Sequence, residues 1–246
     1  MISESVLYGK GVFTTIGIIG ARTFLWEKHW NRLQKNAETI GIDISSLHKE
    51  DVFEEITKSI ETNSVVEGRL RVTVLDESFS RIWSHQNYHQ TRFFIIVGER
   101  RPSVSCFRLT VSPYSTNSMS PLTGVKSCNY LEPILSLDEA KVRGFYEAIR
   151  LNERGVVTSA CMANVFWLAG GKLFTPGLST GCLAGTTREF VMENLDCCEV
   201  EVGIEALADA EAIFLTSAGI GVQRVAEFEG KRLEIVDHPI LHLLPY

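Results

Sequence analysis

The sequence predicts a protein of two domains that combine helices with β-strands, and three observations support this. The chain of 246 residues is long enough to form one large hydrophobic core or two smaller ones. Helical and strand-like patterns alternate along it. A stretch rich in Pro, Ser and Asn at 112–121 has no apolar periodicity, as is typical of a linker. We therefore expect a first domain at 1–113, a linker at 114–121 and a second domain at 122–246.

The charge pattern argues against nucleic-acid and membrane partners. The formal net charge is -6 at pH 7, and residues of both signs are interspersed without a basic stripe. The N-terminus lacks a basic segment followed by an apolar one, and no window holds about eighteen uninterrupted apolar residues. We expect a cytoplasmic protein that acts on a small molecule.

The six cysteines contain no C-x-x-C pair and no metal-type spacing with histidine. Reduced, mostly buried thiols and no structural metal are therefore expected.

The first domain is predicted from strand-like runs and from apolar residues at helical spacing. The predicted elements are strands at 12–16, 69–75, 91–97 and 107–111, a short strand that closes at 24–25, and helices at 27–40 and 51–62. A polar loop at 76–90 carries His85, Tyr88 and His89, and it is either a surface loop or a substrate lid.

Two motifs in this domain concern phosphate. Gly9-Lys10-Gly11 looks like a phosphate loop, but such loops open a helix and here a β-branched strand follows, so we reject that reading. His29 and Arg32 lie three residues apart on one helix face, where an arginine can form paired, charge-assisted hydrogen bonds with a phosphate. The alternative is that both are ordinary solvated helix residues.

The second domain has the same mixture of patterns. The predicted elements are helices at 134–144, 189–194 and 203–208, strands at 145–151, 156–166, 173–175 and 212–216, and a last hairpin through Gly230.

A glycine-rich turn precedes the helix at 189–194. Gly181 and Gly185 are followed by Thr186, Thr187 and Arg188, and glycines with hydroxyl residues at a helix start form an anion-binding site. The alternative is an ordinary turn with a threonine cap.

The order of these features resembles the fold-type IV pyridoxal-phosphate (PLP) enzymes, the class IV aminotransferase family. This family includes branched-chain and D-amino-acid transaminases and 4-amino-4-deoxychorismate lyase. The segments that carry the resemblance are Tyr8 to Thr15, His29-x-x-Arg32-Leu33, Lys126-x-x-Asn129-Tyr130-Leu131, Glu147-Ala-Ile, Gly155 to Phe166 with Asn164-Val-Phe, Thr175-Pro176, and Gly181-x-x-x-Gly185-x-Thr187-Arg188.

The resemblance implies a small N-terminal α/β domain, a larger mixed C-terminal domain that binds PLP, and a homodimer. It makes Lys126 the catalytic lysine that forms the internal aldimine and later moves a proton at the substrate. Arg32, Thr186 and Thr187 become the phosphate contacts. Asn164 and Ser217 are also implied to lie at the cofactor, while the neighbouring Ala218 supplies no hydroxyl.

The chain departs from the family pattern at Ser159 and Lys10. The family has a glutamate at the place of Ser159, and that carboxylate keeps the pyridine nitrogen protonated. A serine hydroxyl leaves the ring a weaker electron sink, which favours elimination over transamination. Lys10 stands where an acidic residue is usual.

Phe13-Thr14-Thr15 and the segment 158–167 resemble the family's aminodeoxychorismate lyases more than its branched-chain enzymes. The resemblance thus implies release of pyruvate and formation of 4-aminobenzoate, a step of folate biosynthesis. A transaminase remains open and would need a carboxylate-binding arginine, for which Arg92, Arg100 and Arg101 are candidates. A third reading is a PLP-binding fold with degenerate catalysis, because Ser159 replaces the usual glutamate.

Overall fold

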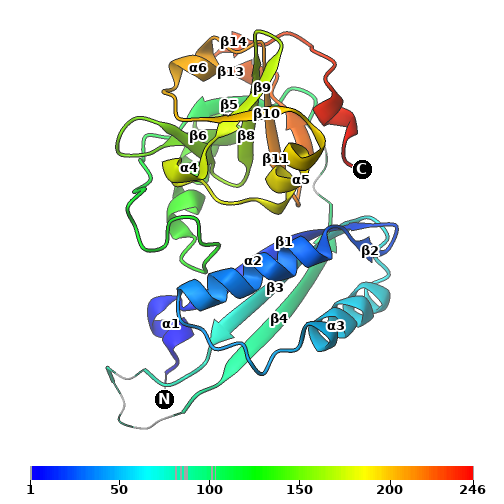
Figure 1. Cartoon of the computed structure of the whole chain (residues 1–246), viewed down its shortest axis with the longest axis vertical. Helices are drawn as coiled ribbons and strands as arrows, with labels where there is room; N and C mark the ends of the chain where they lie inside the picture. Colours follow the sequence, from blue (N-terminus) through cyan, green and yellow to red (C-terminus); the bar gives the residue numbers. More distant parts are fainter. Residues whose placement is uncertain are drawn as a thin grey trace. The chain divides into compact units, whose positions relative to one another are not determined.

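A computed structural model describes residues 2–80, 82–83, 85, 88–100, 102 and 104–245. It divides the chain into two compact units (Figure 1). The first comprises Met1–Arg101 and Val125–Tyr130, and the second Pro102–Gly124 and Leu131–Tyr246. This division differs from the predicted boundaries. The predicted linker at 114–121 lies within the second unit, and the segment 125–130, which contains Lys126 and is called the lysine segment below, belongs to the first.

The first unit is one antiparallel sheet with helices on one face. Its strand order is β2-β1-β3-β4. The bounds are β1 (Gly11–Ile19), β2 (Arg22–Thr23), β3 (Gly68–Asp76), β4 (Thr91–Glu99), α1 (Glu4–Tyr8), α2 (Trp26–Thr39) and α3 (Lys49–Thr62). The predicted helices and long strands of this unit are therefore confirmed, with ends that shift by a few residues.

Alternation along β1 separates the two faces of this sheet. Val12, Ile16 and Ile18 are buried in one core with Trp30 and other apolar residues of α2 and α3. Phe13 and Thr15 point to the opposite face, and they pair with Thr73 and Arg71 of β3. That face carries the side chains that surround the predicted catalytic lysine.

The second unit contains two five-stranded sheets, ordered β10-β9-β8-β11-β12 and β14-β13-β5-β6-β7. The strands are β5 (Arg108–Val111), β6 (Glu147–Leu151), β7 (Val157–Ala160), β8 (Asn164–Ala169), β9 (Lys172–Pro176), β10 (Cys197–Val200), β11 (Ala212–Ser217), β12 (Gly221–Arg224), β13 (Glu227–Phe228) and β14 (Lys231–Arg232). The helices are α4 (Leu131–Val142), α5 (Thr186–Asn194), α6 (Glu205–Ala208) and the 3₁₀ turns η1 (Leu178–Thr180) and η2 (Pro239–His242).

A shared apolar core joins the two sheets, with Ile149 and Val157 from one and Val165 and Ile213 from the other. On the outer face of the β8–β11 sheet, Val191 of α5 packs in a second core with other apolar residues of these strands. Leu137 and Ala140 of α4 pack against Ala148 of β6 and Cys161. Helices α4 and α5 therefore each cover the outside of one sheet.

The strand predicted at 156–166 is two strands, β7 and β8, because the chain turns at 161–163. The carboxylate of Glu147 holds this turn by accepting backbone N–H groups from Ala148, Cys161 and Met162. Burial raises the pKa of the Glu147 carboxyl. The apolar composition of residues 156–166 gave no sign of this turn, because the residue that stabilises it, Glu147, lies on another strand.

The segment 114–121 follows β5 and is tied to the second unit. The Thr116 N–H donates to the Leu151 carbonyl over 2.7 Å, and the Ser118 N–H and hydroxyl both donate to the Glu153 carboxylate. Polar composition alone does not distinguish such an anchored loop from a free linker.

All six cysteines are free thiols, but the expected burial holds only in part. Cys161 and Cys182 are buried, whereas Cys106 and Cys198 are exposed.

Among the described residues, no helix combines the length and the apolarity needed to cross a membrane.

Candidate active site

Lys126 is held by backbone pairing of its segment with β1. The Phe13 N–H donates to the Lys126 carbonyl over 2.9 Å, and the Cys128 N–H donates to the Gly11 carbonyl over 2.8 Å. Val12 and Ser127 form an antiparallel bridge. The segment 125–130 therefore extends the sheet of the first unit, although it is distant in the sequence.

Close packing explains the Gly9-Lys10-Gly11 turn. A Cβ at Gly11 would lie 2.9 Å from the Cys128 sulfur, and one at Gly9 would lie 2.7 Å from Asn129 Oδ1. Lys10 forms an ion pair with Asp76 over 2.8 Å. The turn lets the lysine segment approach β1, which agrees with rejecting a phosphate loop here.

The amine of Lys126 lies in an aromatic and cationic environment. Its Nζ is 4.5 Å from the Phe13 ring centre and 4.8 Å from that of Tyr130, and it donates to the Tyr130 hydroxyl over 3.4 Å. Burial, together with the nearby charges of Arg32 and Arg71, lowers the pKa of Lys126 to about 7. A large share of the amine is therefore neutral and nucleophilic near pH 7.

Arg71 is the cation beside Lys126 that sequence reasoning missed. Its guanidinium carbon lies 3.5 Å from the Phe13 ring centre, and its Nε donates to the Thr73 hydroxyl over 2.9 Å. The arginines considered for a substrate carboxylate were Arg92, Arg100 and Arg101, of which Arg101 lies outside the described residues. Nothing in the local pattern of a β-strand arginine distinguishes Arg71, because only the sheet register brings it to the lysine.

Thr14 connects the predicted pair His29 and Arg32. Arg32 Nη2 donates to the Thr14 hydroxyl oxygen over 2.9 Å, and this hydroxyl lies 2.7 Å from His29 Nδ1. Burial, then the charges of Arg32 and Lys126, hold the pKa of His29 well below its ordinary range. A neutral His29 thus orients Arg32 through Thr14.

In the second unit, Asn164 and Gly185 fix the start of α5. Asn164 Nδ2 donates to the Leu183 carbonyl over 2.8 Å. A Cβ at Gly185 would collide with Asn164 Oδ1. Gly185 is the N-cap residue and provides no capping side chain, so the helix end that carries buried Thr186 and Thr187 suits an anion. Through its hydrogen bond to the Leu183 carbonyl, Asn164 fixes the loop that precedes α5.

Strand β11, which pairs with the strand of Asn164, places the Thr216 hydroxyl at this end of α5. Thr216 pairs with Asn164, and Phe214 pairs with Phe166, so all four side chains lie on the face that α5 covers. Thr216 is fully buried, and within the described part of the chain its Oγ1 has no hydrogen-bond partner. The predicted Ser217 comes next along β11 and points to the opposite face.

Ser159 lies on β7, directly opposite Arg150 of β6 in the antiparallel pair. The predicted site residues are thus distributed between the two units. Lys126 and Arg32 lie in the first unit, and Ser159, Asn164, Thr186, Thr187 and Ser217 lie in the second.

The chain belongs to the amino-transferase class IV family, whose model matches residues 11–228. It is accordingly a PLP-dependent lyase or transaminase of this class, as the sequence predicted. The two-domain α+β fold of the class is also confirmed.

Relatives of both activities are similar to this chain. An aminodeoxychorismate lyase of Bacillus subtilis is 27% identical over 221 residues, which cover 86% of this chain and 75% of the lyase. A structure from Legionella pneumophila, assigned as a candidate 4-amino-4-deoxychorismate lyase, has a TM-score of 0.88 and 26% identity, covering 98% of this chain and 91% of its own. The branched-chain aminotransferase of Thermoproteus uzoniensis, solved with norvaline, has a TM-score of 0.86 and 25% identity, covering 98% and 85%.

The residues present fit PLP. Lys126 offers a buried, partly neutral amine, as covalent attachment of an aldehyde requires. The Thr216 hydroxyl, which has no hydrogen-bond partner among the described residues, lies at the N-terminal end of α5, where a phosphate is favoured.

Proposed function

We propose that this chain binds PLP through Lys126 and releases pyruvate from 4-amino-4-deoxychorismate to form 4-aminobenzoate. When bound, PLP supplies an electrophilic carbon and an electron-withdrawing ring. Lys126 of the first unit provides the covalent attachment and, once displaced by the substrate amine, the base that moves the substrate's proton. Its lowered pKa suits both roles near neutral pH.

The phosphate contacts in this proposal come from Arg32 and from the start of α5. Thr14 and His29 hold the Arg32 guanidinium in position, which favours bidentate binding of a phosphate. The N-terminus of α5 contributes backbone N–H groups, and Thr216 a buried hydroxyl. We assign Thr216 this role in addition to the residues expected from the sequence.

Arg71 is the proposed partner of a substrate carboxylate. Its guanidinium lies beside Lys126 and against the Phe13 ring, and Phe13 and Tyr130 exclude water from the amine. Both the lyase substrate and an amino acid carry a carboxylate, so this residue supports either activity.

The presence of Ser159 is the observation that favours a lyase over a transaminase. A serine at the proposed ring-nitrogen position supplies no negative charge to hold a proton there, so the ring withdraws electrons weakly. Elimination tolerates this weak electron withdrawal, because the electrons pass to the oxygen of the leaving group as the carbon–oxygen bond breaks. The substrate loses one ring proton, its enolpyruvyl ether bond breaks, and the proton ends on the methylene carbon of pyruvate. Atoms and electrons balance without an oxidant.

The first experiment compares products. The PLP-loaded protein is given 4-amino-4-deoxychorismate, and pyruvate and 4-aminobenzoate are measured; in parallel it is given branched-chain or D-amino acids with a keto acid. We expect equal amounts of pyruvate and 4-aminobenzoate, with transamination at least about 100-fold slower, and no product from Lys126→Ala. Faster transamination would make the chain a class IV aminotransferase.

A Ser159→Glu variant tests the reason for this choice. It is expected to gain the transaminase half-reaction, because a carboxylate restores the proton on the ring nitrogen. If it forms no pyridoxamine phosphate while its PLP content is unchanged, Ser159 does not decide the reaction.

The homodimer expected from the resemblance is also part of this proposal.

A further inference from the structure

Arg150 lies next to the proposed ring-nitrogen position. It is the cross-strand partner of Ser159, and side chains directly opposite in an antiparallel pair have Cβ atoms about 5 Å apart on the same face. The pairing of Ile149 with Ala160 points the neighbouring residues to the opposite face, into the core shared by the two sheets. Arg150 and Ser159 therefore share the outer face, toward α4.

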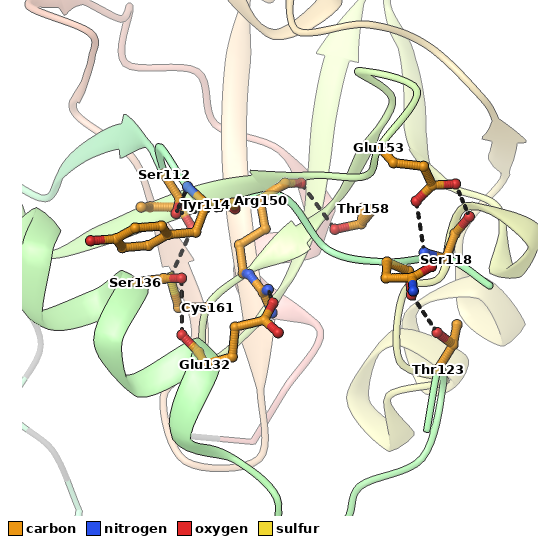
Figure 2. Close-up of polar contacts among 12 residues, drawn as sticks. Ser112, Tyr114, Ser118, Thr123, Glu132, Ser136, Arg150, Glu153, Thr158 and Cys161 are labelled. Carbon is orange, nitrogen blue, oxygen red and sulfur yellow. Dashed lines mark hydrogen bonds and ion pairs between the residues drawn. The ribbon is translucent and has the colours of Figure 1, made fainter. Parts of the chain in front are cut away.

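The guanidinium of Arg150 is buried and anchored at one end. The residue is 6% exposed, and Figure 2 shows its ion pair with Glu132 of α4 and the Thr158 hydroxyl on its carbonyl oxygen. Glu132 is mostly exposed to water, so it screens the buried charge only in part. In the described part of the chain, the buried Nε of Arg150 has no hydrogen-bond partner.

Besides Glu132, the titratable groups near Arg150 are Cys161 and Glu147. Cys161 is buried with Ala148 and α4 on the same side of the sheet. Its thiol donates to the Ala148 carbonyl, and burial raises the pKa of that thiol. The Glu147 carboxylate is occupied by backbone N–H groups at the 161–163 turn. Ser159 itself carries no charge.

We propose that Arg150 keeps the pyridine nitrogen of bound PLP unprotonated, acting from its position beside Ser159. This inference rests on the proposed binding of PLP. A fixed cation disfavours a second positive charge nearby, and it does so strongly where water is excluded. The chain thus replaces a carboxylate that would hold the proton with an uncharged serine and a neighbouring cation that repels it.

The consequence is a reaction restricted to elimination. A neutral pyridine stabilises negative charge on the substrate poorly, so steps that build up such charge are slowed. A step that passes the electrons directly to a leaving group is affected less. Arg150 would then contribute to the choice between lyase and transaminase chemistry.

The test is the ionisation of the ring nitrogen itself. The protein is loaded with PLP labelled with ¹⁵N in the ring, and the nitrogen chemical shift is followed as a function of pH for wild type and Arg150→Gln. We expect an unprotonated nitrogen in the wild type down to about pH 6. In Arg150→Gln its apparent pKa should rise by about one to two units, as expected for removal of a like charge at this range.

Two further variants separate charge from structure. Arg150→Lys keeps a cation and should retain the wild-type titration. Glu132→Gln changes an exposed side chain and removes the counter-charge, so it should lower the nitrogen's apparent pKa below that of the wild type. A purely structural role of Arg150 predicts no such opposite shifts.

The outcomes are distinct. A protonated nitrogen in wild type near pH 7, or the same titration in wild type and Arg150→Gln, overturns the inference while the proposed function stands. A failure of the wild type to bind PLP overturns the proposed function and this inference with it. If Arg150→Gln does not fold, Glu132→Gln and Arg150→Lys still decide the question.

Discussion

At the scale of single residues, burial gives Lys126 its chemical character. An exposed lysine is protonated at neutral pH, but here desolvation and two arginines bring its pKa to about 7. Keeping such an amine away from water costs stability, which the fold recovers elsewhere. The site residue and the stability of the cofactor-free protein are therefore linked.

This linkage predicts the effect of Lys126→Met on the cofactor-free protein. Between about pH 7 and 10.5 the unfolded chain binds a proton at Lys126 that the folded chain has released, so wild-type stability rises with pH in this window. Met removes the penalty and should stabilise the protein by on the order of 5 kcal/mol below pH 7. The gain should shrink as the pH approaches 10.5.

Thermal unfolding at pH 6.5 and pH 9.5 measures this difference. The exposed Lys35 on α2 provides the control, since Lys35→Met should change stability equally at both values. A Lys126→Met gain that is absent or independent of pH would contradict the lowered pKa.

Thr14→Val tests how Arg32 is positioned. The variant keeps the shape of the side chain but removes the hydroxyl that joins Arg32 and His29. We expect PLP affinity to fall about 10-fold, as for loss of a hydrogen bond to a charged group, with little change for pyridoxal, which lacks the phosphate. The comparison is Thr57→Val, on the exposed surface of α3; equal affinities of the two variants would exclude this role for Thr14.

Residue chemistry was predictable from the sequence only where a motif marks it. Arg32 follows His29 at helical spacing, and Thr187 follows a glycine turn, so both could be proposed from local pattern. Lys126 carried a signal only through the family resemblance. Arg71, Thr216 and Arg150 are strand residues, and their neighbours depend on sheet register, which no local pattern shows.

At the scale of elements, glycines set how closely segments approach. Gly11 admits the lysine segment against β1, and Gly185 admits Asn164 against the start of α5. Both glycines belong to motifs that resemble phosphate loops, yet only the second precedes a helix. The helix and strand types were largely predictable, while the turn at 161–163 was not, because Glu147 determines it from another strand.

Gly185→Ala should displace the loop before α5. Its Cβ would collide with Asn164 Oδ1, and relief of such overpacking costs about 1–3 kcal/mol. We expect a lower melting temperature and at least about 10-fold weaker PLP binding. Gly177→Ala is the matched control, because its Cβ would make only ordinary contacts, the nearest at 3.5 Å. Similar behaviour of the two variants would show that Asn164 does not fix this loop.

At the scale of the whole molecule, the chain does not divide where its composition changes. Residues 125–130 return to the first unit by pairing with β1, whereas 114–121 stay with the second. The mixed α and β architecture was predictable from the alternation of patterns, and the family from the order of the motifs. The unit boundaries were not, since they depend on pairing between distant strands.

The most direct measurement of the central claim is the site of covalent attachment. The protein is incubated with PLP, reduced with borohydride, digested and analysed by mass spectrometry. The proposal predicts one phosphopyridoxyl group, on Lys126, and none on this peptide when Lys126→Met is treated alike. Attachment to another lysine, or no attachment by a folded wild-type protein, would contradict the assignment of Lys126 and the function proposed from it.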